Sequence, residues 1–113
     1  MLEYTMPRPV GTIGETKLKI LAIIYQNELR GITSYGYNIW TTLKKKFHCY
    51  IDDRNLRNVY RHLKDLNEVG LIEKGANQPA GNAPERRLYS LTDNGRQWKQ
   101  KFSKYLEILE AAS

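Results

Sequence analysis

Cysteine and histidine are scarce in this sequence of 113 residues, which has one cysteine, Cys49, and two histidines, His48 and His62. One cysteine cannot form a disulfide framework within the chain. One thiol and two imidazoles at this spacing also cannot supply the four ligands of a structural zinc site. We therefore predict no disulfide, no metal site and no cofactor.

Long apolar runs and enzyme motifs are also missing. No segment approaches the roughly 20 apolar residues that a membrane-spanning helix needs, and Met1–Val10 lacks the apolar core of a signal peptide. The sequence has no glycine-rich phosphate loop, no nucleophile elbow and no metalloprotease motif. We predict a cytoplasmic protein that is not an enzyme and does not contact a membrane.

Acidic residues are outnumbered, because 12 Asp and Glu stand against 18 Lys and Arg, for a net charge of +6. The excess is concentrated in two zones. Residues 40–64 carry seven basic and two acidic side chains, and residues 85–104 carry six and two. Such an excess favours a polyanionic partner. The two zones must meet on one face if they bind one ligand.

The segment Asp52–Ile72 has the clearest pattern. Its apolar residues recur at steps of three or four, which places them on one face of a helix: Leu56, Val59, Leu63 and Leu66. The opposite face carries guanidinium and amide groups that suit phosphates and base edges: Arg54, Asn55, Arg57, Asn58 and Arg61. Gly70 supplies a left-handed C-cap for this helix. A solvated basic face is the alternative interpretation.

Two further helices are predicted before this one. Residues 1–14 contain two Pro and two Gly without periodicity and are interpreted as a flexible arm. A helical pattern starts at about Glu15 and is followed by a loop that can hold a short strand at Gly31–Thr33. Ser34 can cap a second helix, Tyr35–Phe47. Three helices with a short link between the second and third have helix-turn-helix order.

After Gly70 the pattern changes from helix to strand. Leu71–Lys74 and Arg87–Leu91 alternate apolar and polar residues, as a two-stranded ribbon does. Between them, Gly75–Pro84 contains two Gly, two Pro and two Asn, a composition typical of a loop. We therefore predict a mainly α fold of the α+β class, a winged helix-turn-helix with a two-stranded wing, as a DNA-binding domain over residues 15–91.

Residues 92–113 predict one C-terminal helix, from Asp93 to about Ala111, with Thr92 as its cap. One apolar stripe runs along it: Trp98, Phe102, Tyr105, Leu106 and Leu109. A last helix in a small domain rarely needs so large a stripe for its own core. We interpret this stripe as a dimerisation face, with plain core as the alternative.

Three stretches carry a family resemblance. VYRHLKDLNEVGLIEK at residues 59–74 resembles a recognition helix followed by a first wing strand. RRLYSLTDNG at residues 86–95 resembles a second wing strand leading into a final helix, and YGYNI at residues 35–39 resembles the start of a second helix. Together they resemble the PadR family of winged-helix transcriptional regulators, from Leu18 to about Leu109. The resemblance implies DNA binding and a last helix that packs against the first helix of the partner subunit.

The helix-turn-helix order and the resemblance together give the DNA-contact candidates: Arg54, Asn55, Arg57, Asn58, Tyr60, Arg61, Arg86, Arg87, Lys44 and Lys45. Arg61 stands where the family has Pro, and Arg57 and Asn58 stand where it has small residues, so this helix is unusually basic. Only one of Arg86 and Arg87 is expected to face DNA, because strand residues alternate between faces. The loop Gln26–Ser34 is longer than is usual in the family.

Some members of the family bind flat aromatic effectors in a pore at the dimer centre, lined by Trp from the last helix. Trp98 and Trp40 are the corresponding candidates here, with interface core as the alternative. We predict a nucleoid-associated homodimer that regulates transcription, as a repressor, on a pseudo-palindromic site in double-stranded DNA. The alternatives are a regulator gated by an aromatic effector, and a winged-helix protein–protein adaptor without DNA binding.

Overall fold

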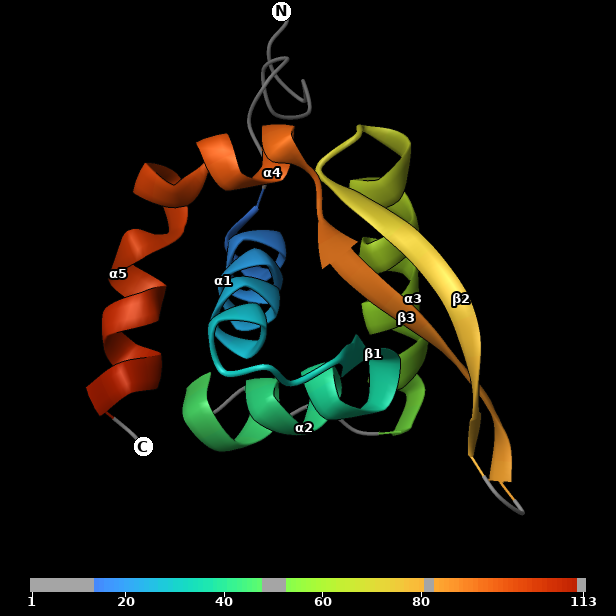
Figure 1. Ribbon diagram of the computed structural model, residues 1–113. Helices are drawn as coiled ribbons and strands as arrows, with labels where there is room; N and C mark the ends of the chain where they lie inside the picture. Colours follow the sequence, from blue (N-terminus) through green and yellow to red (C-terminus); the bar gives the residue numbers. More distant parts are fainter. Residues whose placement is uncertain (1–13, 48–52, 81–82, 112–113) are drawn as a thin grey trace, which may run out of the picture.

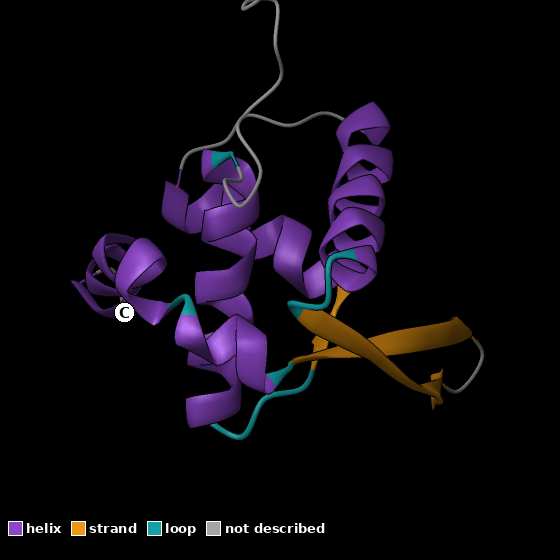
Figure 2. Cartoon of the chain, turned by 90° about the horizontal axis from the view of Figure 1, so that it is seen from above, coloured by secondary structure: helices purple, strands orange, loops and turns teal. Residues whose placement is uncertain are grey.

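The computed structural model describes the backbone of residues 14–47, 53–80 and 83–111, and in these ranges all side chains except those of residues 53–55, 76–80 and 83–86. The elements are α1 (Glu15–Leu29), β1 (Ser34–Tyr35), α2 (Gly36–Phe47), α3 (Asp53–Glu68), β2 (Ile72–Ala80), β3 (Ala83–Leu91), α4 (Asp93–Gln97) and α5 (Lys99–Ala111). The strands form one antiparallel sheet of order β1-β3-β2. The ribbon of β2 and β3 projects from the helices as a wing (Figures 1 and 2). The predicted winged helix-turn-helix fold is thus confirmed. Of the predicted arm, residues 1–14, only Gly14 belongs to the described residues.

Helix α1 is the centre of the molecule, with α5 on one side of it and α3 and the sheet on the other (Figure 1). Five consecutive residues of α1, Ile20–Ile24, are buried. A helix that is apolar around its whole circumference must be covered on every side. Helices α2, α3 and α5 and strand β3 all contact α1 and provide this cover.

The C-terminal apolar stripe is part of this same core. Four of its five residues are buried in the single chain, namely Phe102, Tyr105, Leu106 and Leu109, and Trp98 is partly buried. The Phe102 ring packs on the Tyr25 ring of α1 with their centroids 5.8 Å apart. The Tyr105 hydroxyl donates a hydrogen bond to Oε1 of Glu15, also on α1, over 2.7 Å. The stripe is therefore covered within the single chain, as the plain-core alternative expects, and its role in dimerisation stays a prediction.

A break at Trp98 makes this packing possible. The predicted single helix from Asp93 to Ala111 is wrong, because α4 ends at Gln97 and α5 begins at Lys99. Trp98 has φ −84° and ψ 5°, and its carbonyl accepts a bond from the Lys101 N–H over 2.7 Å. The chain turns here, so that α5 lies beside α1 (Figure 1).

The Thr92 side chain connects the end of α3 to the start of α4 through hydrogen bonds with backbone groups. Gly70 has φ +83°, which confirms the predicted left-handed C-cap. The Thr92 hydroxyl donates to the Gly70 carbonyl over 2.6 Å and accepts from the Gly95 N–H over 3.0 Å, which confirms Thr92 as a cap. A Cβ on Gly95 would collide with the Leu71 carbonyl oxygen. This junction therefore requires both a hydroxyl at residue 92 and a glycine at residue 95.

The strands differ from their predicted bounds. The first strand is Ser34–Tyr35 rather than Gly31–Thr33. The predicted N-cap role of Ser34 is wrong, because its hydroxyl accepts from Asn27 Nδ2 over 3.0 Å, while Asn38 Oδ1 accepts from the Tyr35 N–H over 2.9 Å. Strands β2 and β3 also extend through most of the predicted tip, with an irregularity between Lys74 and Asn77.

None of the described helices is both long enough and apolar enough to cross a membrane.

Candidate nucleic-acid interface

The exposed face of α3 is basic. Val59, Leu63 and Leu66 are buried, and they fix the rotation of the helix about its axis. The opposite face is exposed, with residues at helical spacing: Arg57, Tyr60, Arg61 and Lys64. Asn58 is partly buried beside them. The backbone of Arg54 and Asn55 belongs to the first turn of α3, and their side chains lie outside the described residues.

Lys64 was not among the residues singled out from the sequence. It follows Arg61 by three positions and Arg57 by seven, so it continues the same stripe. This spacing was available in the sequence and could have identified it. The stripe of Arg57, Arg61 and Lys64 is called the α3 basic stripe below.

Tyr60 lies between this stripe and the start of α2. Its side chain is 46% exposed, and its ring covers Gly36, the first residue of α2. A Cβ built on Gly36 would lie 2.6 Å from the Tyr60 hydroxyl oxygen. Only a residue without a side chain allows this approach, which gives Gly36 a physical role that the sequence pattern did not reveal.

Strand β3 brings the wing to the same side of the molecule as α3 (Figures 1 and 2). Arg87 on β3 is exposed, and the Arg86 side chain lies outside the described residues. Tyr89 on the same strand lies close to Tyr60: burial raises the pKa of Tyr89, and the neighbouring Tyr60 raises it further, while Arg87 acts in the opposite direction. Only part of the second basic zone therefore lies beside α3: Arg87 is on the wing, whereas Arg96, Lys99, Lys101 and Lys104 are on α4 and α5.

The lysines at the end of α2 have different surroundings. The Lys44 ammonium lies 3.6 Å from the centroid of the Trp40 ring, which is a close cation–π contact. Trp40 itself is buried and packs edge-on against Tyr37, with ring centroids 5.5 Å apart. Lys45 is exposed. Of these two lysines, Lys44 is thus held against its own chain.

The structure does not bring Trp98 and Trp40 together within one subunit. Trp98 joins α4 to α5, whereas Trp40 is on α2, and Figure 1 shows α4 and α2 on opposite sides of α1. Trp40 is also covered by Lys44. Among the described residues, no group of three or more His, Cys, Asp or Glu side chains is placed to hold a metal ion.

Three helices in helix-turn-helix order, a short β1 and a two-stranded wing beside a basic helix face define a winged-helix protein of the kind that reads nucleic acid. The sequence pattern of the transcriptional regulator PadR-like family matches residues 20–101, which is more than half of the chain. The chain belongs to this family.

Solved structures agree with this assignment. PadR of Bacillus subtilis in complex with operator DNA is 25% identical, with a TM-score of 0.60 over 84% of this chain and 48% of that one. The chain thus spans about half the length of that protein. A Streptococcus mutans protein is 27% identical, with a TM-score of 0.59 over 84% and 78% of the two chains. A PadR-like regulator from Bacillus cereus, 24% identical with a TM-score of 0.59 over 84% of each chain, shares the fold. The curated proteins contain no match.

Proposed function

We propose that this chain regulates transcription by binding double-stranded DNA as a homodimer. The observation that carries the proposal is the α3 basic stripe, which is exposed beside the wing. Helix-turn-helix proteins insert this helix into the major groove, where Arg side chains can bond guanine edges in pairs. The B. subtilis relative, whose structure contains operator DNA, supports this use of the fold.

The neighbouring groups suit the DNA backbone. We assign the Tyr60 hydroxyl and Lys45 to phosphates flanking the groove. Arg87, with Arg54, Asn55, Asn58 and Arg86 as further candidates, completes the proposed contact surface. Lys44 is left out of it because its ammonium is held over Trp40.

In this chain α5 covers α1, so a dimer built on α5 requires this helix to leave its own α1. We propose that the two chains exchange α5, so that each α5 packs on the α1 of the partner. The break at Trp98 is the natural hinge for this exchange. Exchanging identical elements preserves the contacts of each chain and is a low-cost route to dimers. Light scattering should then give twice the chain mass of 13.2 kDa. A species of 13.2 kDa that still binds a full palindrome tightly would contradict the proposed homodimer.

Repression is the simplest mode for such a dimer, since a bound operator is closed to other proteins.

A flat aromatic effector at Trp98 fits the same proposal, because Trp98 is partly buried at the hinge. Tryptophan fluorescence quenching by phenolic ligands, lost in Trp98→Phe, would support the effector. Unchanged fluorescence across a broad panel would leave Trp98 as a packing residue.

Titration of random duplex DNA at two salt concentrations tests the function as a whole. Contacts between basic side chains and phosphates release counterions, so affinity should fall steeply as salt rises. An adaptor that binds only proteins would show no DNA binding at either salt concentration. That result would overturn the proposed function in favour of the adaptor.

A further inference from the structure

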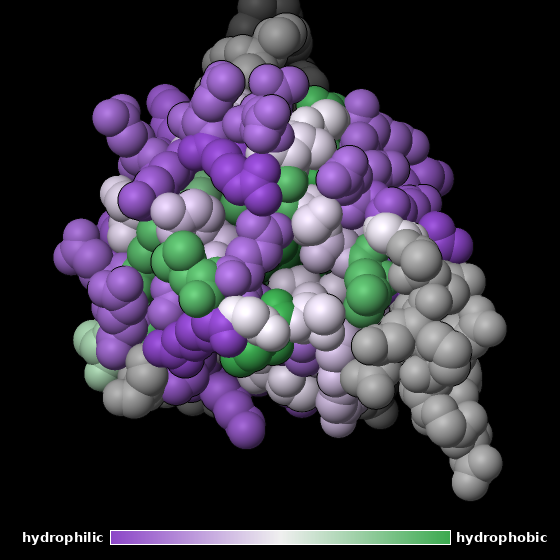
Figure 3. Space-filling model, in the orientation of Figure 1, coloured by the Kyte–Doolittle hydropathy of each residue, from purple (hydrophilic) through white to green (hydrophobic). Residues whose placement is uncertain are grey.

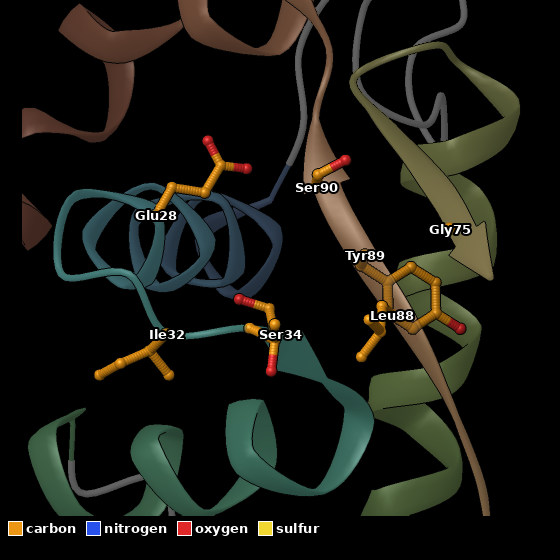
Figure 4. A pocket seen from close by; sticks show the side chains of 8 residues that line it. Glu28, Ile32, Ser34, Gly75, Leu88, Tyr89 and Ser90 are labelled. Carbon is orange, nitrogen blue, oxygen red and sulfur yellow. The ribbon is translucent and has the colours of Figure 1, made fainter. Parts of the chain in front are cut away.

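A hollow of about 300 Å³ lies where the end of α1 meets the base of the wing (Figure 4). The end of α1, the loop before β1 and the strands β2 and β3 all contribute to its lining. The residues that matter here are Glu28, Ile32, Ser34, Gly75, Leu88 and Ser90. The predicted loop Gln26–Ser34 is wrong in its bounds, because α1 extends to Leu29 and β1 begins at Ser34, so only residues 30–33 join the two elements.

The hollow is on the face of the sheet turned away from α3. Figure 4 shows the Tyr89 ring directed toward α3, and the Leu88 side chain directed away from it. Ser90 shares the face of Leu88 because strand residues alternate, and its hydroxyl contacts Glu73 across the ladder over 3.4 Å. Tyr89 is also part of the lining, so the hollow adjoins the proposed DNA surface through β3, while Leu88 and Ser90 face away from α3.

Gly75 keeps this hollow open. It lies in the irregular part of β2 between Lys74 and Asn77. Its backbone is not in the left-handed region, and a Cβ added there would meet Leu88 at 3.6 Å, an ordinary van der Waals distance. The fold thus tolerates a side chain at residue 75, but that side chain would occupy the hollow.

The lining defines a class of ligand. Ile32, which is 47% exposed, and Leu88 give it apolar walls, and Figure 3 shows apolar side chains reaching the surface in the middle and lower part of this side of the molecule. The Glu28 carboxylate accepts from the Leu91 N–H over 2.8 Å and from Arg96 over 3.1 Å. Arg96 balances its charge, so a cation gains little, while an anion would meet a carboxylate. Each carboxylate oxygen still has a lone pair for a ligand donor.

We propose that this hollow binds a small uncharged molecule with an apolar body and one hydrogen-bond donor, and that its occupancy changes DNA affinity. The volume is at the lower end for ligand pockets and is too small for a peptide helix. The coupling follows β3, because Leu88 and Tyr89 both line the hollow, Arg87 precedes them, and the Tyr89 ring is directed toward α3. This second part rests on the proposed function, whereas the binding site itself does not.

Titration of the ¹⁵N-labelled full chain with indole, followed by NMR, tests the site. Indole has an apolar body and one N–H donor. We expect saturable shifts at the amides of Gly75, Leu88 and Ser90, and no such shifts with benzoate, an anion of similar size. Gly75→Val should abolish the indole shifts. Lys74→Val, which adds the same side chain one residue earlier on the other face of β2, should keep them. If Gly75→Val does not fold, Leu88→Trp fills the hollow from β3.

Absence of saturation, equal shifts with benzoate, or an unchanged response in a folded hollow-filling variant would overturn the site. DNA affinity measured with and without indole tests the coupling. We expect a change of about fivefold or more, with DNA changing indole affinity by the same factor. Binding of indole with unchanged DNA affinity would overturn the coupling alone. Binding of indole by a chain that binds no DNA would overturn the proposed function and leave the site intact.

Discussion

Arg57, Arg61 and Lys64 owe their common direction to the residues between them. Val59, Leu63 and Leu66 are buried, and burial of each such side chain stabilises the fold by roughly 1.5–3 kcal/mol. Rotation of α3 about its axis would expose these side chains to water. The basic stripe is therefore held on the surface by the apolar face behind it, before any ligand is bound.

Replacement of both Arg57 and Arg61 with Ala is expected to remove specific DNA binding and leave the fold intact, since both side chains are exposed. Loss of a paired guanine contact costs about 1–3 kcal/mol of discrimination. Fluorescence anisotropy with a selected site measures this loss. Lys99→Ala with Lys101→Ala removes the same charge from α5 and serves as the control. Wild-type affinity in the Arg57/Arg61 variant would show that α3 does not read the bases.

Gly36→Ala should lower stability, because its Cβ would overlap the Tyr60 ring. Overpacking of this kind typically costs about 1–3 kcal/mol. Adding Tyr60→Ala should remove the overlap, so the two substitutions together should cost less than the sum of their separate effects. Urea unfolding of the wild type, the two single variants and the double variant measures this difference. Additive effects would mean that the ring does not cover Gly36.

At the scale of elements, the sequence correctly predicted two helix ends that are decided by local chemistry. Gly70 and Thr92 act through their own backbone angles and hydroxyl, and both predictions are confirmed. An apolar stripe, in contrast, shows that a helix face is covered but not by what. The stripe of α5 was for this reason assigned to a partner subunit, whereas α1 of the same chain covers it.

The wing and the site show the same limit. The composition of Gly75–Pro84 is typical of a loop, yet cross-strand pairing extends β2 to Ala80 and β3 back to Ala83. Pairing depends on the partner strand, which local composition does not encode. Likewise, the exposed position of Arg57 follows from helical spacing, whereas the contact of Lys44 with Trp40 depends on side-chain packing.

Phe102→Ala is expected to destabilise the single chain by about 3–5 kcal/mol, because Phe102 is fully buried against α1. Thermal or urea unfolding at low protein concentration measures this loss. Ile108→Ala, on the exposed side of the same helix, is the control and should change little. Equal, small effects of the two substitutions would show that α5 does not pack on α1.

The contact between Tyr105 and Glu15 makes the packing of α5 sensitive to pH. The hydrogen bond from Tyr105, with Lys104 and Lys19 nearby, lowers the pKa of Glu15 from its ordinary value of 4.5. A lowered pKa stabilises the fold above that ordinary value, and this contribution is lost as pH falls through the pKa of the folded state. In Tyr105→Phe the pKa of Glu15 should rise, as followed by carboxyl NMR. An unchanged pKa would mean that the bond is not formed.

At the scale of the whole molecule, the arrangement separates three tasks. Helix α1 holds the core, α3 and the wing present the basic surface, and α5 follows the break at Trp98 and packs on α1 (Figure 1). In a two-fold dimer with exchanged α5 helices, two α3 helices would lie on one side. Two-fold symmetry of the protein demands two-fold symmetry of the DNA site, with half-sites about 34 Å apart or a multiple of that distance.

Selection of bound sequences from a random pool of duplex DNA at physiological salt tests this account most directly. We predict enrichment of an inverted repeat whose half-sites are separated by a whole number of helical turns, and loss of that enrichment in the Arg57/Arg61 variant. Enrichment of a single, unrepeated site, or of no sequence at all, would contradict a dimer that reads DNA through α3.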